Sequence, residues 1–354
     1  MSRLEFPRLR APIVQAPMAG GPSTPVLAAA VSAAGGLGFL AAGYRSAAEL
    51  RADIVEARAL GGEPLGVNLF LLVPGAVDER ALAAYAARIG ADAARRGAEL
   101  GEPRFEDDEL DAKLGVVCDE RPAVVSFTFG CPAAAVVERL HERGIAVWVT
   151  VTEVDEALAA ERAGADALVA QGAEAGGHRG SFADEDGRGE VALLPLLALL
   201  RAASELPLVA SGGIAGGAAV AAVLAAGASA AQIGTAFMRS PEAATNAAQR
   251  AALAGPGATA LTRAFTGRRA RGIVNDFMRE HGAAAPSAYP HVHHLTAPLR
   301  RAARSSGDAS AINLWAGQAF ALASEAPAGE LVARWSEEAR VALAEAAHRL
   351  GEGR

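Results

Sequence analysis

Short apolar runs alternate with longer amphipathic stretches along this 354-residue chain, from residue 13 to about residue 253. Runs that are apolar at nearly every position suit strands buried on both faces, as in α/β proteins with a parallel sheet. Eight repeats of this unit predict a closed (β/α)8 TIM barrel, and an open doubly wound sheet is the alternative. The predicted strands are Ile13–Met18, Leu37–Ala42, Leu65–Leu71, Ala123–Phe129, Ala146–Val151, Ala167–Ala170, Leu208–Ser211 and Ala231–Gly234.

The stretches between these runs carry the residues that begin and end helices. With Ser23 or Thr24 as its cap, the first predicted helix has Pro25 in its first turn. Gly35 ends it, as glycine commonly does at a helix C-terminus. The predicted helices of the barrel are Ser23–Ala33, Ser46–Leu60, Pro132–Arg143, Glu153–Ala163, Val191–Ser204, Gly216–Ala226 and Pro241–Leu253.

The regular spacing breaks between Pro74 and Arg121, where charged helical sequence replaces the short connection expected in a barrel. We therefore predict that residues 1–73 and 122–258 form the barrel, with residues 74–121 as an inserted lid or small subdomain. Residues 259–354 are predicted to be mixed at first and then helical. This C-terminal extension is expected to pack on the barrel.

Composition narrows the class of protein. Hydrophobic residues make up 51% of the chain, which is enough for a large core and excludes global disorder. A net charge of −7 disfavours nucleic acid or an anionic membrane as the partner. The charge-free stretches 26–43 and 206–238 are rich in alanine and interrupted by glycine turns, so neither is predicted to span a membrane. Two cysteines cannot form a disulfide scaffold, and a cytoplasmic location is expected.

Glycines and polar residues gather where the predicted strands end. In a parallel barrel the active site lies at these carboxyl ends, and phosphate groups bind after the seventh and eighth strands. Gly213 follows the seventh predicted strand, while Gly234 and Thr235 close the eighth. One glycine pair alone indicates a tight turn. Two such turns on adjacent strands favour a phosphorylated cofactor held by backbone N–H groups.

His178 follows two glycines in a long loop, residues 171–190. An imidazole, whose ordinary pKa is about 6.5, can accept a proton or orient an anion at neutral pH. A loop histidine by itself is more often a surface residue. The flanking glycines and the preceding Gln171 and Glu174 favour a functional role, so His178 is the predicted chemical residue.

Two other clusters of residues are not predicted to take part in catalysis or ligand binding. The histidine-rich segment 291–294 lacks helical ligand spacing and a carboxylate partner, so no metal site is predicted there. The basic run formed by Arg268, Arg269 and Arg271 is interpreted as a solvated loop.

Six stretches in chain order, from residue 12 to about residue 238, together resemble the class I nitronate monooxygenases, formerly called 2-nitropropane dioxygenases. They are PIVQAPMAGG, GVNLF, VVSFTFG, AQGAEAGGHRG, LVASGGI and AAQIGTAFM, with NDFM and NLWAGQ further along. The same barrel also serves FMN-dependent enoyl-acyl carrier protein reductases and NAD(P)H:quinone reductases. The AGGH sequence by itself therefore does not distinguish between these enzymes.

The resemblance implies an FMN site across the barrel mouth and no metal. Backbone at Pro17, Met18 and Ala19 would lie against the flavin ring. Asn68 and Gln171 would hydrogen-bond the cofactor, and Gly176 would approach it closely. The ribityl phosphate would be held by Gly213, Gln232, Ile233, Gly234 and Thr235. His178 would be the catalytic residue, either deprotonating a nitroalkane or orienting the anionic nitronate.

The function implied is FMN-dependent oxidation of alkyl nitronates, such as propionate 3-nitronate, with O2 to a carbonyl compound and nitrite. NAD(P)H would not be needed. Two alternatives stay open: an NAD(P)H-dependent FMN reductase of quinones or enoyl thioesters, and a non-catalytic FMN-binding protein. The partners expected are therefore small molecules, a nitronate or nitroalkane and O2.

Overall fold

An eight-stranded parallel barrel forms the centre of the computed structural model, which describes residues 3–351. Its strands follow the order β1-β9-β8-β6-β5-β4-β3-β2. The ends of this order are joined because Gln15 N–H donates to Leu37 O at 2.9 Å and Leu37 N–H donates to Ile13 O at 3.0 Å. The strands are β1 Ile13–Gln15, β2 Gly38–Ala41, β3 Leu65–Phe70, β4 Val124–Thr128, β5 Ala146–Val151, β6 Ala167–Gln171, β8 Leu208–Ser211 and β9 Ala230–Ile233.

The predicted TIM barrel is thus confirmed, and every predicted strand lies within a few residues of an observed one. The largest difference is at β1, which ends at Gln15 rather than Met18. Ala16 N–H still donates to Ile233 O at 2.8 Å, but the next residue is Pro17, which has no N–H to continue the ladder. The chain turns away there and enters the barrel mouth.

The barrel interior is filled with apolar side chains, as a barrel of eight strands requires. Trp148 on β5 is fully buried among side chains from other strands of the barrel, including Val14 on β1 and Phe39 on β2. Phe6 of the N-terminal segment stacks on Trp148 with ring centroids 5.2 Å apart. The N-terminal segment therefore closes the end of the barrel opposite the strands' carboxyl ends.

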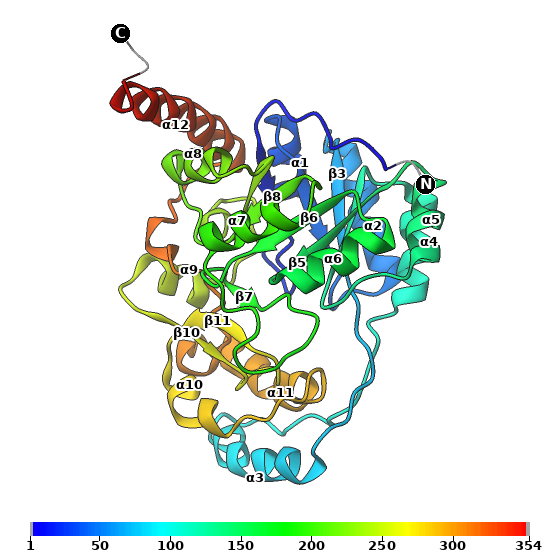
Figure 1. Ribbon diagram of the computed structural model, residues 1–354. Helices are drawn as coiled ribbons and strands as arrows, with labels where there is room; N and C mark the ends of the chain where they lie inside the picture. Colours follow the sequence, from blue (N-terminus) through cyan, green and yellow to red (C-terminus); the bar gives the residue numbers. More distant parts are fainter. Residues whose placement is uncertain (1–2, 352–354) are drawn as a thin grey trace.

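Seven helices of the outer shell come from the connections between strands, and the eighth comes from the C-terminus. Helix α12 lies against α8 and α1 (Figure 1), where its Trp335 meets Phe237 at 5.0 Å between ring centroids. The helix that follows the last strand, α9 Ala247–Ala254, packs instead beside the C-terminal segment. The shell comprises α1 Pro25–Ala33, α2 Ala47–Ala59, α4 Leu110–Glu120, α5 Ala134–His141, α6 Val154–Ala163, α7 Leu193–Ala203, α8 Gly217–Ala225 and α12 Ala328–Arg349.

The stretch between β3 and β4 divides into two parts. Helix α4 packs on α2 and β3, and its Leu114 and Val117 join the core beneath the shell. Helix α3, Glu79–Arg95, reaches across to the C-terminal segment, where Tyr85 donates to Ala264 O at 2.6 Å. Residues 74–121 therefore contribute both to the shell and to a layer beyond the barrel mouth.

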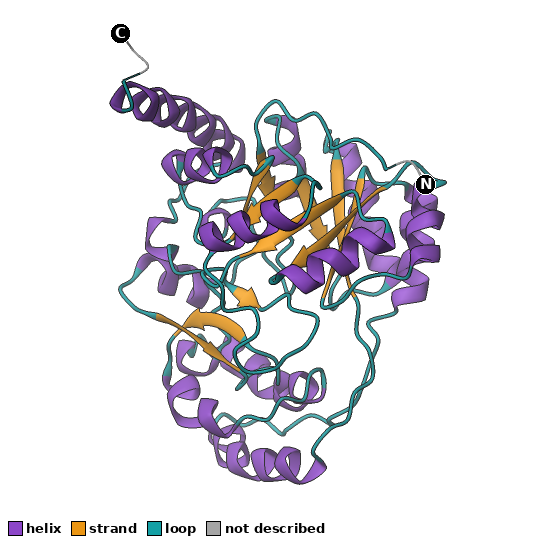
Figure 2. Cartoon of the chain, in the orientation of Figure 1, coloured by secondary structure: helices purple, strands orange, loops and turns teal. Residues whose placement is uncertain are grey.

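A second, three-stranded antiparallel sheet faces the barrel mouth (Figure 2). It has the order β10-β11-β7, where β10 is Thr259–Thr262, β11 is Ala270–Ile273 and β7 is Gly177–His178. Because β7 belongs to the loop after β6, this sheet ties the C-terminal segment to the barrel. The segment also contains α10 Asp276–His281, α11 His291–Ser306 and 3₁₀ turns at Gly282–Ala284, Ala309–Ala311 and Phe320–Leu322.

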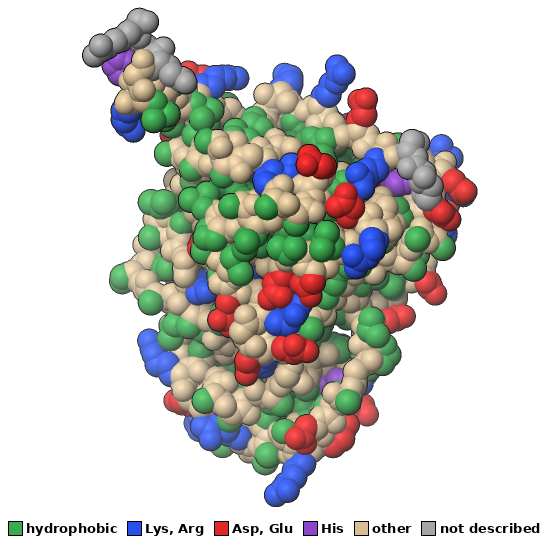
Figure 3. Space-filling model, viewed as in Figure 1, with side chains coloured by type: hydrophobic (Ala, Val, Ile, Leu, Met, Phe, Trp, Pro, Cys, Tyr) green, Lys and Arg blue, Asp and Glu red, His purple; other side chains and the backbone are tan. Residues whose placement is uncertain are grey.

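Acidic and basic side chains are interspersed over the face shown in Figure 3. This mixed distribution agrees with the small net charge of −7. Within residues 3–351, no helix is both long and apolar enough to cross a membrane.

Replacing Trp148 tests the closure of the barrel. We expect Trp148→Ala to lower the free energy of unfolding by about 3–5 kcal/mol, because it leaves a cavity under Phe6. Trp148→Phe should cost less than half as much, since it keeps an aromatic ring and removes an indole N–H for which residues 3–351 offer no acceptor. Denaturant unfolding followed by circular dichroism measures both values. Equal losses in the two variants would contradict this view of the packing.

Candidate active site

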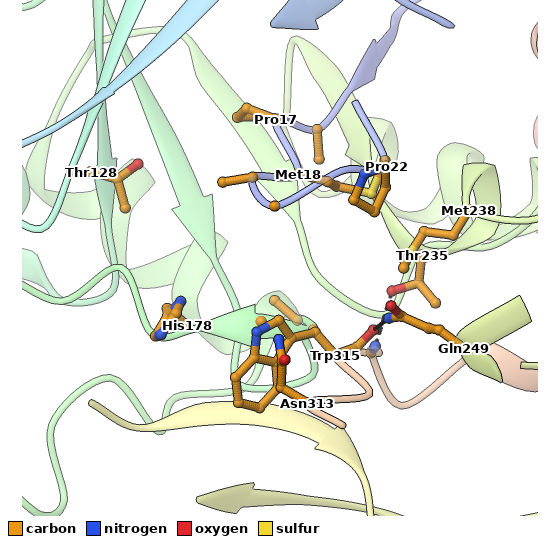
Figure 4. Close-up of a pocket in the computed structure, with 18 of the residues that line it drawn as sticks. Pro17, Met18, Pro22, Thr128, His178, Thr235, Met238, Gln249, Asn313 and Trp315 are labelled. Atoms are coloured by element: carbon orange, nitrogen blue, oxygen red, sulfur yellow. Dashed lines mark hydrogen bonds between the residues drawn. The ribbon is translucent and has the colours of Figure 1, made fainter. Parts of the chain in front are cut away.

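A cavity of about 380 Å³ opens at the carboxyl ends of the barrel strands. In Figure 4 the loop after β1, with Pro17 and Met18, forms one side, and Trp315 and Asn313 of the C-terminal segment form the other. His178 stands at one end of the cavity and Thr235 towards the other. The cavity is therefore built by the barrel and the C-terminal segment together.

The structure brings eleven of the twelve predicted site residues to this one cavity. The exception is Ile233, which is 1% exposed and belongs to the hydrophobic core behind it. The roles assigned to these residues stay predictions. The lining residues among them are Pro17, Met18, Ala19, Asn68, Gln171, Gly176, His178, Gly213, Gln232, Gly234 and Thr235.

His178 is held by a hydrogen bond that fixes which ring nitrogen carries the proton. Its Nε2 lies 2.9 Å from the hydroxyl of Thr266. That hydroxyl donates its own proton to the carbonyl of Arg268 at 3.2 Å, so it must accept from Nε2–H. Nδ1 has no hydrogen-bond partner among residues 3–351. His178 therefore presents an unprotonated Nδ1 to the cavity.

The surroundings of His178 favour the neutral ring. Burial lowers the pKa of His178 to about 3, and the positive charges of Arg268 and Arg300 act in the same direction against the weaker opposite effect of Asp184. The Arg268 guanidinium lies 4.3 Å from the centre of the Phe129 ring, and the planes of the Phe129 and His178 rings are at 89° to each other. At neutral pH the ring is an uncharged base in a positively charged environment.

The interpretation of the basic run as a solvated loop is wrong. Arg268, Arg269 and Arg271 are only 7%, 5% and 8% exposed. Their donors are used by the protein: Arg271 Nε donates to Ala173 O at 2.9 Å, and Arg269 pairs with Asp184 at 3.1 Å. These acceptors lie about 85 to 98 residues away in the chain, so no local pattern indicates the burial.

Asn68 and Gln171 differ in what they leave available to a ligand. Asn68 Nδ2 donates to Ser126 Oγ at 2.9 Å and Thr128 Oγ1 at 3.0 Å, while its Oδ1 receives no donor from residues 3–351. Gln171 closes its own loop, because its Nε2 donates to His178 O at 3.1 Å and its Oε1 accepts from Gly180 at 2.8 Å. Asn68 thus offers an acceptor, whereas Gln171 mainly positions His178.

Two turns after β8 and β9 supply backbone donors. Among residues 3–351, no acceptor is found for the N–H groups of residues 213–215 or 234–236. Both turns line the cavity. The first N–H of α8 is not part of this set, since Gly217 donates to the carboxylate of Glu338 at 2.9 Å. An anion would therefore be held by the two turns rather than by the helix end itself.

Gly176 lets the C-terminal segment approach the barrel. A Cβ atom at this position would lie 2.4 Å from Gly317 N and 2.5 Å from Ala316 C. Gly317 N–H donates to Thr235 Oγ1 at 3.0 Å, which fastens the same segment to the turn after β9. The close approach that requires glycine here is made by the protein's own backbone.

Sequence reasoning missed the aromatic and basic walls. His293 stacks on Tyr44 with ring centroids 4.4 Å apart, and burial lowers the pKa of His293 to about 2. Trp315 lies 5.6 Å from His178 between ring centroids. The quoted stretches GVNLF, VVSFTFG and NLWAGQ contain Phe70, Phe129 and Trp315, but the position of these side chains around His178 depends on tertiary contacts. The other missed lining residues include Phe70, Phe129, Thr266, Arg300, Arg301, Arg304 and Asn313.

A closed parallel barrel with a cavity at the carboxyl ends of its strands is the architecture of the barrel enzymes. Residues 7–338 match the family model described as nitronate monooxygenase. The chain belongs to the nitronate monooxygenase family.

Individual relatives agree with this membership. A nitronate monooxygenase from Pseudomonas aeruginosa is 46% identical over 346 residues, which cover 94% of this chain and 97% of that protein. The structure of a nitroalkane oxidase from Streptomyces ansochromogenes has a TM-score of 0.93 at 50% identity, covering 95% of this chain and 98% of that one. FabK from Thermotoga maritima has a TM-score of 0.76 at 28% identity, covering 96% of each chain. The predicted family and the expected oxidoreductase class are confirmed.

The Thr266 contact predicts the protonation state of His178. We expect ¹⁵N NMR spectra to show a neutral ring protonated at Nε2 down to about pH 5, because its pKa is lowered to about 3. Thr266→Val should mix the two neutral tautomers, since no acceptor remains for Nε2–H. Thr266→Ser keeps the hydroxyl and should preserve the wild-type spectrum. A charged His178 ring at pH 6 would contradict the assignment.

Proposed function

We propose that this chain is an FMN-dependent monooxygenase that oxidises alkyl nitronates with O2 to a carbonyl compound and nitrite, without NAD(P)H. The observation that carries the proposal is the neutral His178, whose free Nδ1 faces a cavity with a positively charged wall. Such a site favours an anion next to an uncharged base. The cytoplasm is the proposed compartment, since Cys118 and Cys131 are unpaired.

The residues lining the cavity fit FMN. The unpartnered N–H groups of the turns at Gly213 and Gly234 would hold the phosphate, with the Thr235 hydroxyl beside them. Asn68 Oδ1 would accept from an N–H group of the ring, and the loop at Pro17 would lie against the ring. When bound, the flavin supplies the electron acceptor and the reactivity towards O2.

The protein's own groups would handle the proton and the charge of the substrate. With a nitroalkane, His178 Nδ1 would take the proton from the carbon bearing the nitro group, leaving a nitronate beside an imidazolium. Thr266 would hold the ring during this step by accepting from Nε2–H. With a preformed nitronate no proton needs to be removed, and His178 would orient the anion.

The aromatic wall would limit the access of water to this chemistry. Phe129 and Trp315 lie 5.9 Å and 5.6 Å from His178 between ring centroids. Tyr289 lies 5.5 Å from the same ring. Apolar surroundings strengthen the electrostatic interaction between His178 and the anion. They also exclude water, which would otherwise hydrolyse reactive intermediates.

Anaerobic mixing tests the reaction class. The purified protein should show an oxidised-flavin spectrum that propionate 3-nitronate bleaches and NADPH leaves unchanged. Bleaching by NADPH alone would make the chain a reductase of quinones or enoyl thioesters. A flavin that no donor reduces would indicate a binding protein. Protein that cannot take up FMN would contradict the proposed cofactor site.

Replacing His178 tests its proposed role. We expect His178→Asn to retain bound flavin but to lower kcat/KM about 100-fold or more with nitroethane, because no base remains for the proton transfer. The loss with preformed ethylnitronate should be much smaller. Steady-state oxygen consumption with the two substrates measures this difference. Equal losses would remove proton transfer from the role of His178.

A further inference from the structure

A second, smaller cavity of about 240 Å³ adjoins the cavity that contains His178. We call it the outer pocket, and the proposed function gives it no role. Its walls come from the loop after β2, the end of β3, the inserted segment 74–121 and the start of α11. The two cavities share Tyr44 and His293 as wall residues. They are therefore neighbours that are separated by side chains rather than by backbone layers.

Tyr289 brings the outer pocket close to the proposed base. It lines the outer pocket, and its ring lies 5.5 Å from His178 and 5.7 Å from Phe129 between ring centroids. The hydroxyl groups of Tyr289 and Tyr44 are hydrogen-bonded at 3.0 Å. We call these two side chains the tyrosine gate. They close the outer pocket on the side that faces His178.

The backbone of Tyr44 is held in an unusual conformation. Its φ is +65°, in the left-handed region that residues other than glycine rarely adopt. The Tyr44 N–H donates to Asp108 Oδ1 at 2.9 Å, and Asp108 is paired with the buried Lys113 at 2.7 Å. Such a conformation persists where the surrounding structure fixes it. The gate is therefore expected to open by rotation of a side chain on an anchored backbone.

Weak contacts hold the Tyr44 ring in the closed position. It stacks on His293 with ring centroids 4.4 Å apart and meets Phe70 at 5.7 Å with the ring planes at 74°. One hydroxyl–hydroxyl hydrogen bond and two aromatic contacts are each modest in energy. Tyr44 is also 39% exposed, so its ring has space on the solvent side. Rotation of Tyr44 would join the two cavities without unfolding any element.

The cations that line the outer pocket have carboxylate partners within the protein. Arg45 pairs with Asp53 at 2.7 Å, and Arg104 pairs with Glu106 at 3.1 Å. Burial lowers the pKa of His294, so this histidine adds no positive charge at neutral pH. An anion would gain little from arginines whose charge is already compensated. The outer pocket therefore suits a small uncharged molecule that can lie against its aromatic walls.

We propose that the outer pocket is an entry site for small uncharged nitroalkanes, which pass the tyrosine gate to reach His178. This inference rests on the proposed function. The carboxylate of Glu109 at the pocket wall disfavours the anionic nitronate. A neutral nitroalkane is also the form from which His178 Nδ1 would remove a proton, so the entry site and the base suit the same molecule.

Blocking the outer pocket tests the route. In a Cys131→Ser protein, Arg104→Cys supplies an accessible thiol at the outer pocket, because Cys118 is buried. Labelling this thiol with a bulky maleimide should lower kcat/KM for nitroethane about tenfold or more, relative to the same protein before labelling. The matched control is the same label on Ala344→Cys, at the exposed end of α12, which should change kcat/KM less than about twofold.

The cavity that contains His178 also reaches the surface at Arg301, an exposed residue of α11. Unchanged turnover of nitroethane after labelling of Arg104→Cys would place entry at that opening and reject the outer pocket as the entry site.

Widening the gate tests the role of the tyrosine pair. We expect Tyr289→Ala to raise kcat/KM for nitrocyclohexane about tenfold relative to that for nitroethane, because a larger molecule can then pass. Tyr289→Phe keeps the ring and should give a smaller rise. The maleimide on Arg104→Cys should abolish the rise in the Tyr289→Ala protein. A rise that survives the label would place the effect inside the inner cavity and reject the gate.

Fluorescence quenching separates entry from the reaction. Trp315 lines the cavity 5.6 Å from His178, whereas Trp148 and Trp335 are buried in the core. Nitroethane quenches indole fluorescence on collision, so quenching of Trp315 reports access to the cavity without turnover. The maleimide on Arg104→Cys should lower the quenching constant about threefold or more, and Trp315→Phe should remove the quenched component.

The two readouts distinguish failure of the entry site from failure of the proposed function. Quenching that the label suppresses, in a protein that oxidises no nitroalkane, would support the entry site and reject the proposed function alone. Quenching and turnover that are both unaffected by the label would reject the entry site alone.

Discussion

The pairing of β7 with β11 is the constraint on which the rest of the site depends. His178 lies opposite Ala270 and Gly177 opposite Arg271, so a two-residue strand in a barrel loop is fixed to the C-terminal segment. The same pairing brings Thr266 within hydrogen-bonding distance of His178. Without this pairing, the barrel mouth would lack one wall. The His178 ring would also lose the hydrogen bond that determines which of its nitrogens carries the proton.

Buried arginines reinforce this junction by using backbone carbonyls as partners. Arg179, which is fully buried, donates to the carbonyls of Gln171, Gly172 and Gly189, and so holds both ends of the loop together. A carbonyl satisfies a guanidinium donor without cancelling its charge. The loop is thereby ordered while the charge of Arg179 persists. His178 itself is neutral chiefly because it is buried, and the charge of Arg268 lowers its pKa further.

Elements whose burial follows from their own sequence could be predicted, and elements whose burial depends on distant partners could not. The strands are apolar at nearly every position, as in Ala146–Val151, where Thr150 is the one polar residue, and a parallel barrel then dictates which ends carry the site. The basic run at 268–271 looks solvent-exposed, because its acceptors lie elsewhere in the chain. The final shell helix, α12, could not be assigned its place either, since an amphipathic face does not say which groove it fills.

Charge, finally, explains how a histidine with so low a pKa can act as a base. A pKa of about 3 corresponds to about 5 kcal/mol against the charged ring, relative to an ordinary histidine. An anion about 4 Å away contributes about 4 kcal/mol in its favour at an effective dielectric constant of about 20. A nitronate formed beside the ring therefore offsets most of the penalty. Protonation of His178 and formation of the anion therefore stabilise each other. When no anion is present, the ring stays neutral and adds no further positive charge to a cavity that already contains several arginines.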